Sequence, residues 1–93
     1  MARKPRHYSG GNLRRMRRLM KLQQTDVAKR FGLKNTAIIS RWERGEVLPN
    51  LENAFMLAKL YRVMVDELFY EVGVSCRKKL FPDETTIITR KKR

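Results

Sequence analysis

Glycine and proline divide the middle of this 93-residue chain into segments that are too short for anything but small helices. Gly32 and Gly45 bracket one such segment, and Pro49 follows shortly after it. Before Gly32, Val27, Ala28 and Phe31 recur at the spacing of one helix face. An apolar period near 3.6 residues indicates an amphipathic helix, and a glycine just past its end is a common helix stop. The pattern therefore predicts an all-α fold built from short helices.

The same periodicity predicts five helices in one compact domain. Asn12 and Asn35 are expected to cap the first and third, because an Asn side chain can accept a hydrogen bond from a free N–H of the first turn. The expected helices cover residues 12–21, 24–31, 36–44, 51–61 and 65–69. The expected buried face of the fourth carries Leu51, Ala54, Phe55, Ala58 and Tyr61.

The domain organisation follows from these helices. Residues 1–11 are basic and end in Ser-Gly-Gly, which favours a flexible arm, and residues 12–71 hold the expected helices. Residues 72–93 lack helical periodicity and are expected to form an extended C-terminal tail. Within this tail, residues 85–89 (Thr-Thr-Ile-Ile-Thr) have the composition of a short strand.

The positive charge is large and unevenly distributed. The chain has 22 Lys and Arg against nine Asp and Glu, for a net charge of +13. Residues 1–22 contribute eight basic and no acidic side chains, whereas residues 46–75 have a net charge of −3. A basic surface attracts polyanions, since each neutralised phosphate releases condensed counterions. Nucleic acid is therefore the first partner to consider and an anionic membrane the second.

Residue counts exclude several other classes of protein. One Cys and one His can form neither an intrachain disulfide nor a zinc site, so no metal is expected. No nucleophile–base set or phosphate-cradling glycine loop indicates an enzyme, and no cofactor is expected. The chain has no secretion signal and no apolar run approaching the ~20 residues of a membrane span. These features are compatible with a cytoplasmic protein.

The third expected helix, residues 36–44, has two chemically different faces. With Ile39 turned inward at 100° per residue, Asn35, Trp42 and Glu43 also face the core. The opposite face carries Ala37, Arg41 and Arg44, flanked by Ile38 and Ser40. Such a face suits a DNA major groove, where Arg can bridge guanine O6 and N7. From this helix alone, an outer face that is merely solvated is an equal alternative.

Glu43 is an unusual residue for an inward position. A buried carboxylate must be paired, because its desolvation otherwise costs several kcal/mol. Arg17, in the first expected helix, is the candidate partner. If the pair forms, it positions the third helix against the first and does not itself read DNA.

Residues 13–69 resemble the Cro/lambda-repressor-type helix-turn-helix family, also called the XRE family. The shared pattern comprises Leu13, Met16, Arg17 and Leu22, then Gln24-Thr25-Asp26-Val27-Ala28-Lys29, Gly32, Ile39-Ser40-Arg41-Trp42-Glu43-Arg44-Gly45 and Pro49, and finally Leu57-Ala58, Val63 and Val65-Asp66-Glu67-Leu68. The resemblance implies a lambda-repressor-like fold of five helices, an internal Arg17–Glu43 ion pair, and binding to double-stranded DNA.

The resemblance also implies which residues contact DNA. Base contacts are expected from Thr36, Ala37, Ile38, Ser40, Arg41 and Arg44, and phosphate contacts from Gln24, Lys34 and Asn35. Proteins of this type usually bind palindromic sites as homodimers, with half-sites ~34 Å apart. The resemblance therefore implies a transcriptional regulator of the repressor type, associated with the nucleoid.

Several positions depart from the family pattern. The segment between Gly32 and Gly45 is one residue longer than the commonest spacing, so the base-contacting register can slip by one. Gln23 and Met64 stand where a capping Ser or Thr is preferred, and Arg62 stands where Gly usually ends the fourth helix. Glu46 replaces a frequently basic residue, which argues against a phosphate contact there.

Alternatives remain open outside the central helices. Arg3, Lys4 and Arg6 of the arm are candidates for a minor-groove contact, but a solvated basic tail that adds only nonspecific attraction is the favoured interpretation. The dimer is expected to form through an apolar surface beyond the fifth helix or through residues 85–89. The first surface would comprise Phe69, Tyr70 and Val72. The alternative function is an antitoxin or another protein-interaction module with the same fold, and RNA binding is a weaker one.

Overall fold

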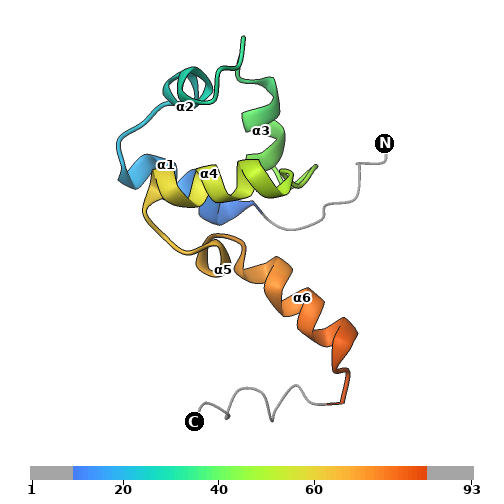
Figure 1. The fold of residues 1–93 in the computed structure, drawn as a ribbon. Helices are drawn as coiled ribbons and strands as arrows, with labels where there is room; N and C mark the ends of the chain where they lie inside the picture. Colours follow the sequence, from blue (N-terminus) through green and yellow to red (C-terminus); the bar gives the residue numbers. More distant parts are fainter. Residues whose placement is uncertain (1–9, 84–93) are drawn as a thin grey trace.

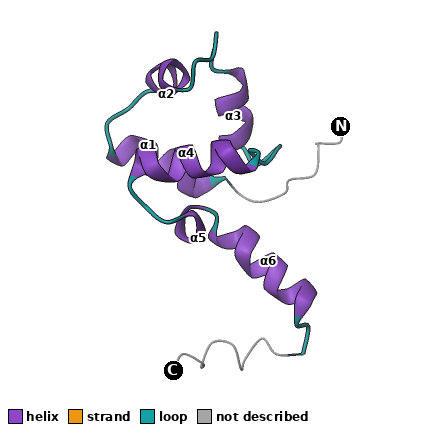
Figure 2. Cartoon of the chain, viewed as in Figure 1, coloured by secondary structure: helices purple, strands orange, loops and turns teal. Residues whose placement is uncertain are grey.

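The computed structural model of the chain describes residues 10–83, which form six helices and no strand (Figures 1 and 2). The helices are α1 (Gly11–Leu19), α2 (Gln24–Arg30), α3 (Ala37–Glu43), α4 (Leu51–Tyr61), α5 (Val65–Leu68) and α6 (Tyr70–Leu80). The all-α fold expected from the sequence is confirmed. Residues 85–89, the expected strand, and the arginines and lysine of the N-terminal arm lie outside the described residues.

One hydrophobic core joins the first five helices. Each of these helices contributes at least one fully buried side chain, which the spacing of the apolar residues places on its inner face. The core comprises Leu13, Val27, Ala28, Ile39, Trp42, Leu57, Ala58, Tyr61, Leu68 and Phe69. Because α3 contributes both Ile39 and Trp42, its inner side is packed against the rest of the domain.

The helix ends follow the local chemistry, with two exceptions to the sequence prediction, one of which is that Thr36 and not Asn35 is the N-cap of α3. Gly32 has a φ of +70° just past α2, and Asn50 caps α4 by accepting a hydrogen bond from the Asn53 N–H at 2.8 Å. Asn12 was expected to cap α1, but Gly10 is the N-cap. The Asn12 side chain instead donates to the Glu67 carbonyl at 2.9 Å, which ties α1 to α5.

The unusual N-caps are compensated from the third helical position. The Gln23 N–H donates to the Asp26 carboxylate at 2.8 Å, and the Met64 N–H donates to the Glu67 carboxylate at 3.2 Å. In each case the carboxylate at the third helical position accepts from the N–H of the N-cap residue, which is one of the two hydrogen bonds of a capping box. This bond satisfies a backbone donor at a helix start where Gln23 and Met64 replace the preferred Ser or Thr. Arg62, as expected, ends α4 in the left-handed region with a φ of 62°.

Gly10 is a structural residue and not part of a flexible linker. It is buried, with a φ of +73°, and it lies directly against the backbone that ends α3. A Cβ at this position would overlap the Glu43 carbonyl oxygen and would stand 2.9 Å from the Gly45 nitrogen. Only glycine allows the chain to approach the end of α3 so closely.

The buried face of α4 differs from the sequence prediction. Ala58 and Tyr61 are buried, but Leu51 and Phe55 are 73% and 49% exposed, and Leu57 fills the core instead. Leu57 and Leu51 belong to different stripes of the same helix, and both stripes have helical spacing. The neighbouring helices, which periodicity cannot reveal, decide which stripe is covered.

Another correction concerns residues 70–80, most of which were assigned to an extended tail. They form α6, which points away from the other five helices (Figure 1). α6 buries none of its side chains, so it has no apolar periodicity by which the sequence could reveal it. The sequence does carry a charge pattern typical of a helix. Glu71 lies in the first turn of α6, and Arg77, Lys78 and Lys79 lie in its last turn, which suits the helix dipole.

None of the helices in residues 10–83 is long and apolar enough to cross a membrane.

Candidate nucleic-acid interface

The segment α2–turn–α3 forms one corner of the domain (Figure 1). The two helices contact each other through the Phe31 and Trp42 rings, whose centroids are 5.9 Å apart with a tilt of 60°. Such a tilted aromatic pair adds to the stability of the contact beyond the area it buries. Leu33 packs against the core within the turn. The arrangement is that of a helix-turn-helix unit.

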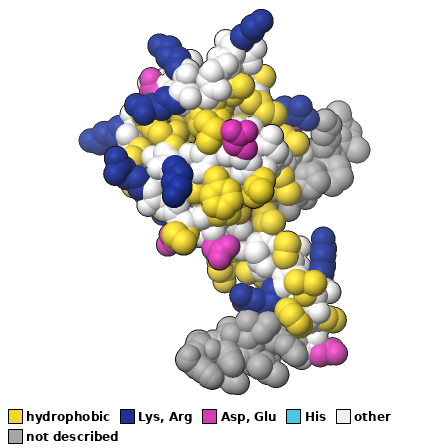
Figure 3. Space-filling model, viewed as in Figure 1, with side chains coloured by type: hydrophobic (Ala, Val, Ile, Leu, Met, Phe, Trp, Pro, Cys, Tyr) yellow, Lys and Arg dark blue, Asp and Glu magenta, His cyan; other side chains and the backbone are white. Residues whose placement is uncertain are grey.

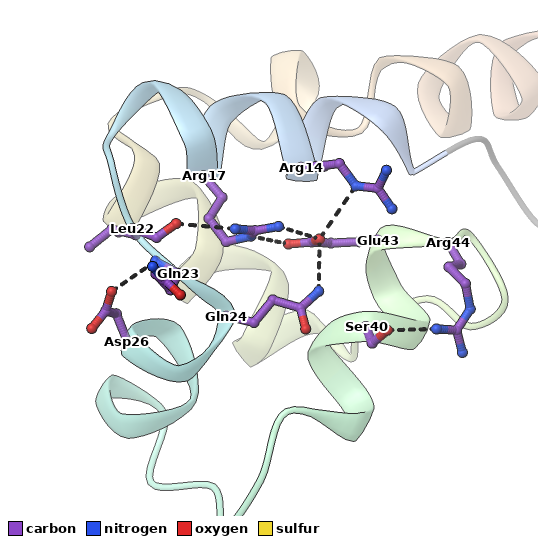
Figure 4. A network of polar contacts seen from close by, with 9 residues as sticks. All are labelled: Arg14, Arg17, Leu22, Gln23, Gln24, Asp26, Ser40, Glu43 and Arg44. Atoms are coloured by element: carbon purple, nitrogen blue, oxygen red, sulfur yellow. Dashed lines mark hydrogen bonds and ion pairs between the residues drawn. The ribbon is translucent and has the colours of Figure 1, made fainter.

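The inner side of α3 carries a buried carboxylate with three hydrogen bonds (Figure 4). Glu43 is 4% exposed. Its Oε2 accepts from Arg17 Nε at 2.6 Å, and its Oε1 accepts from Arg17 Nη2 and from Gln24 Nε2, both at 3.0 Å. Arg14 Nε lies 3.8 Å from the same carboxylate. Residues of α1 and α2 therefore converge on one carboxylate of α3.

Arg17 is held on both sides of its guanidinium. Besides Glu43, it donates through Nη1 to the Leu22 carbonyl at 3.1 Å, in the connection between α1 and α2. Its hydrogen bonds to the Glu43 carboxylate raise the pKa of Arg17 above its ordinary value, so the guanidinium stays charged. A bidentate Arg–carboxylate pair defines orientation as well as distance. This pair therefore sets the angle between α3 and α1.

The outer side of α3 is open to solvent. Ala37 and Arg44 are exposed, and Ile38, Ser40 and Arg41 are half-buried, as is the N-cap residue Thr36. Ile39, Trp42 and Glu43 lie on the opposite, buried side, as the helical wheel predicted. Asn35 does not. It is exposed and lies before the helix, where its Oδ1 accepts from the Ala37 N–H at 2.9 Å. The wheel placed it inward only by extending α3 beyond its first residue.

Four residues at and just beyond the end of α3, namely Ser40, Arg41, Arg44 and Glu46, form a polar cluster that was not predicted from the sequence. Arg44 donates to the Glu46 carboxylate through Nε at 2.7 Å and Nη2 at 3.2 Å, and to the Ser40 hydroxyl through Nη1 at 2.6 Å (Figure 4 shows the contact with Ser40). Arg41 Nε lies 3.6 Å from Glu46 Oε1. The four-residue spacing of Ser40 and Arg44 was a visible signal, since such residues are neighbours on a helix.

The expected phosphate-contacting residues flank the exposed face of α3. Lys34 and Asn35 are exposed in the turn before α3. Gln24 is half-buried at the start of α2, and one of its amide N–H groups is used by Glu43. The amide has a second N–H, so this hydrogen bond still leaves one donor for another acceptor.

Basic side chains gather at the end of the molecule that carries α2 and the turn before α3 (Figure 3). No cluster of three or more metal-ligating side chains occurs within residues 10–83. A surface that gathers Lys and Arg side chains has the charge that suits an anionic polymer.

Comparison with known proteins decides what this corner is. A helix-turn-helix family model matches residues 13–68, which is more than half of the chain. The chain belongs to this helix-turn-helix family. The Cro/lambda-repressor-type resemblance found in the sequence is thereby confirmed, and residues 13–68 form a helix-turn-helix DNA-binding domain.

Two curated relatives are similar over the same region. The Repressor protein C2 of Salmonella phage P22 is 39% identical over 59 residues, which cover 63% of this chain but only 27% of the phage protein. An uncharacterized HTH-type transcriptional regulator of Methanocaldococcus jannaschii is 37% identical over 57 residues, or 61% of this chain and 85% of that protein. The chain therefore matches about a quarter of the length of the phage repressor. No solved structure is significantly similar to this chain.

Proposed function

We propose that the protein is a transcriptional regulator of the repressor type, which recognises a specific double-stranded DNA sequence by placing α3 in the major groove. The division of α3 into two faces carries this proposal. Glu43, Ile39 and Trp42 anchor the inner face. The outer face, with Arg41 and Arg44, is left open to solvent. A helix held at a defined angle with open arginines suits direct reading of base edges.

The proposed contacts divide into two chemical classes. Base contacts come from the open face and its ends, where Ala37 permits close approach and Arg41 can bridge guanine O6 and N7. The proposed base-contacting residues are Thr36, Ala37, Ile38, Ser40, Arg41 and Arg44. Phosphate contacts come from Gln24, Lys34 and Asn35, whose N–H and ammonium groups border this face. The phosphate contacts set the register, and the base contacts select the sequence.

The proposed functional unit is a homodimer on a palindromic site. Phe69, one residue of the expected dimer surface, belongs to the core, which leaves Tyr70 and the half-buried Val72. α6 extends this surface, because Tyr70, Leu80 and Phe81 are 66%, 70% and 46% exposed. Sedimentation at tens of micromolar with a selected DNA duplex tests the dimer. A monomer under these conditions would contradict it.

The basic arm and the location of the protein complete the proposal. Gly10, the first described residue, lies against the end of α3, and Arg3, Lys4 and Arg6 precede it in the sequence. We propose that the arm contacts an adjacent minor groove. A regulator of this kind would work in the cytoplasm, on the nucleoid. The repressor role is supported by the name of the phage relative.

Selection of binding sites from random duplex DNA tests the proposed function directly. A palindromic consensus is expected. Arg41→Ala is expected to relax discrimination at one base pair by about 1–3 kcal/mol, whereas Gln24→Ala should weaken binding to all duplexes alike. Binding without sequence preference that disappears as salt rises would contradict the proposal. That outcome would favour the protein-interaction alternative, for which the exposed Leu51 and Phe55 on α4 provide a surface.

A further inference from the structure

We infer that Glu46 is a specificity-determining residue, whose carboxylate discourages Arg44 and Arg41 from binding phosphate and reserves them for base edges. The inference rests on the proposed reading of DNA by α3. Glu46 lies just beyond α3, where its carboxylate faces two arginines of the outer side of this helix. Its importance comes from the two arginines that it faces.

The geometry places one carboxylate between two reading arginines. Arg44 binds both Glu46 oxygens, at 2.7 and 3.2 Å, and Arg41 Nε lies 3.6 Å from Oε1. The arginine side chains remain 48% and 43% exposed, while that of Glu46 is 27% exposed. The carboxylate is therefore close enough to act on both guanidinium groups, and both remain accessible to DNA.

Ser40 adds a second constraint on the same guanidinium. Its hydroxyl accepts from Arg44 Nη1 at 2.6 Å, on the side of the guanidinium away from Nε. Arg44 is thus oriented by acceptors bound to three of its nitrogens. A guanidinium has five N–H donors, so two donors remain beyond these three hydrogen bonds. These remaining donors can reach a neutral acceptor without breaking the cluster.

The carboxylate affects phosphates and bases differently. A phosphate approaching Arg44 or Arg41 also approaches the negative charge of Glu46, and this repulsion offsets part of the attraction. A guanine edge offers two acceptors but no net charge, so it does not meet the same repulsion. Glu46 therefore weakens phosphate contacts more than base contacts. For a chain with a net charge of +13, whose attraction to any DNA is strong, this difference favours the correct site.

The test compares Glu46→Gln with Glu52→Gln in the full-length chain. Each variant removes one negative charge, so their net charges are equal. Glu52 is exposed on α4 and lines a groove with Phe55 and Met56, not the face of α3. Affinity is measured for the selected duplex and for a scrambled duplex of equal length, each over a series of salt concentrations. Thermal unfolding verifies that both variants are folded.

Glu46→Gln is expected to tighten binding to the scrambled duplex by about 3- to 10-fold, and to the selected duplex by a smaller factor. Its affinity for the scrambled duplex should also fall more steeply with salt, by about 0.9 in log–log slope for each arginine that gains a phosphate. Glu52→Gln should change the affinities for the two duplexes by the same factor. In an Arg44→Ala background the effect of Glu46→Gln should shrink, because its main partner is gone.

Two results would overturn the inference. One is a Glu46→Gln variant whose affinities for the selected and the scrambled duplex change by the same factor, as those of the Glu52 control do. The other is equal weakening on both duplexes with lower thermal stability, which would make Glu46 a structural residue only. A wild-type protein that selects no DNA sequence would contradict the proposed function itself. A clear consensus with an unchanged specificity ratio would contradict only the role of Glu46.

Discussion

Replacing Arg17 with methionine keeps most of the side-chain length but removes the main partner of the buried Glu43 carboxylate. In the wild type, Arg17 donates two hydrogen bonds to Glu43, at 2.6 and 3.0 Å. After the replacement, Gln24 at 3.0 Å and Arg14 at 3.8 Å are the remaining described partners of the carboxylate. Glu43, which is 4% exposed, would then lack its main cation in a poorly solvated position.

The expected loss is large relative to the stability of a domain of this size. Removing one partner of a buried pair costs about 3–5 kcal/mol, and we expect the lower part of that range because Arg14 compensates in part. A small domain is stabilised by only about 0.05–0.15 kcal/mol per residue, or roughly 4–11 kcal/mol for the described region. Arg17→Met should therefore lower the unfolding temperature by at least about 12 °C.

Removing both charges together should be far less harmful. In the double variant Arg17→Met, Glu43→Leu, no buried charge remains, and an apolar pair of similar volume often replaces a buried ion pair without loss. We expect the free energy of unfolding of the double variant to lie within about 1 kcal/mol of the wild-type value. Urea unfolding can be followed through the fluorescence of Trp42, which is the single tryptophan of the chain and is 3% exposed.

Two results would refute this reasoning. If Arg17→Met loses less than about 1 kcal/mol, the pair does not hold α3 in place. If the double variant loses as much unfolding free energy as Arg17→Met and the single variant Glu43→Leu combined, the cost arises from packing of the side-chain stems and not from an unpaired charge.

Three further predictions concern backbone conformation and pH. Gly10→Ala should destabilise the domain by about 2–4 kcal/mol in urea unfolding, because the new Cβ meets backbone atoms. The control Gly32→Ala has the same sign of φ but open space around it, so it should lose only about 1 kcal/mol, and equal losses in the two variants would disprove the close contact. Arg62→Gly should raise stability by about 0.5–1 kcal/mol in the same assay by removing left-handed strain at a φ of 62°, and a loss would show that its side chain matters more. Burial raises the pKa of Tyr61 to about 12, so the unfolded state releases this proton first and the free energy of unfolding should fall as pH rises from about 10 to 12. Tyr61→Phe should reduce that fall by up to about 2–3 kcal/mol, and a variant with the same pH profile as the wild type would refute the raised pKa.

The central part of the fold and of the candidate site could be predicted from the sequence because its signals are local. The apolar spacing around Val27 and Ile39 and the helix stop at Gly32 each depend on residues within a few positions. The inward direction of Glu43 followed from the helical period, and burial of a carboxylate then required a cation such as Arg17. The family pattern rests on these same positions, so the match to residues 13–68 agrees with them.

The remaining features depend on which segments meet in space. Leu51 and Leu57 both have helical spacing on α4, and only the position of the other helices covers Leu57 and exposes Leu51. The burial of Gly10 depends on the end of α3, which is far from it in the sequence. α6 buries no side chain and so has no apolar signature. Periodicity and helix stops thus determined where the helices of the DNA-binding unit lie along the chain. Tertiary packing decided which of their faces is buried, because burial is a property of the neighbours and not of the residue.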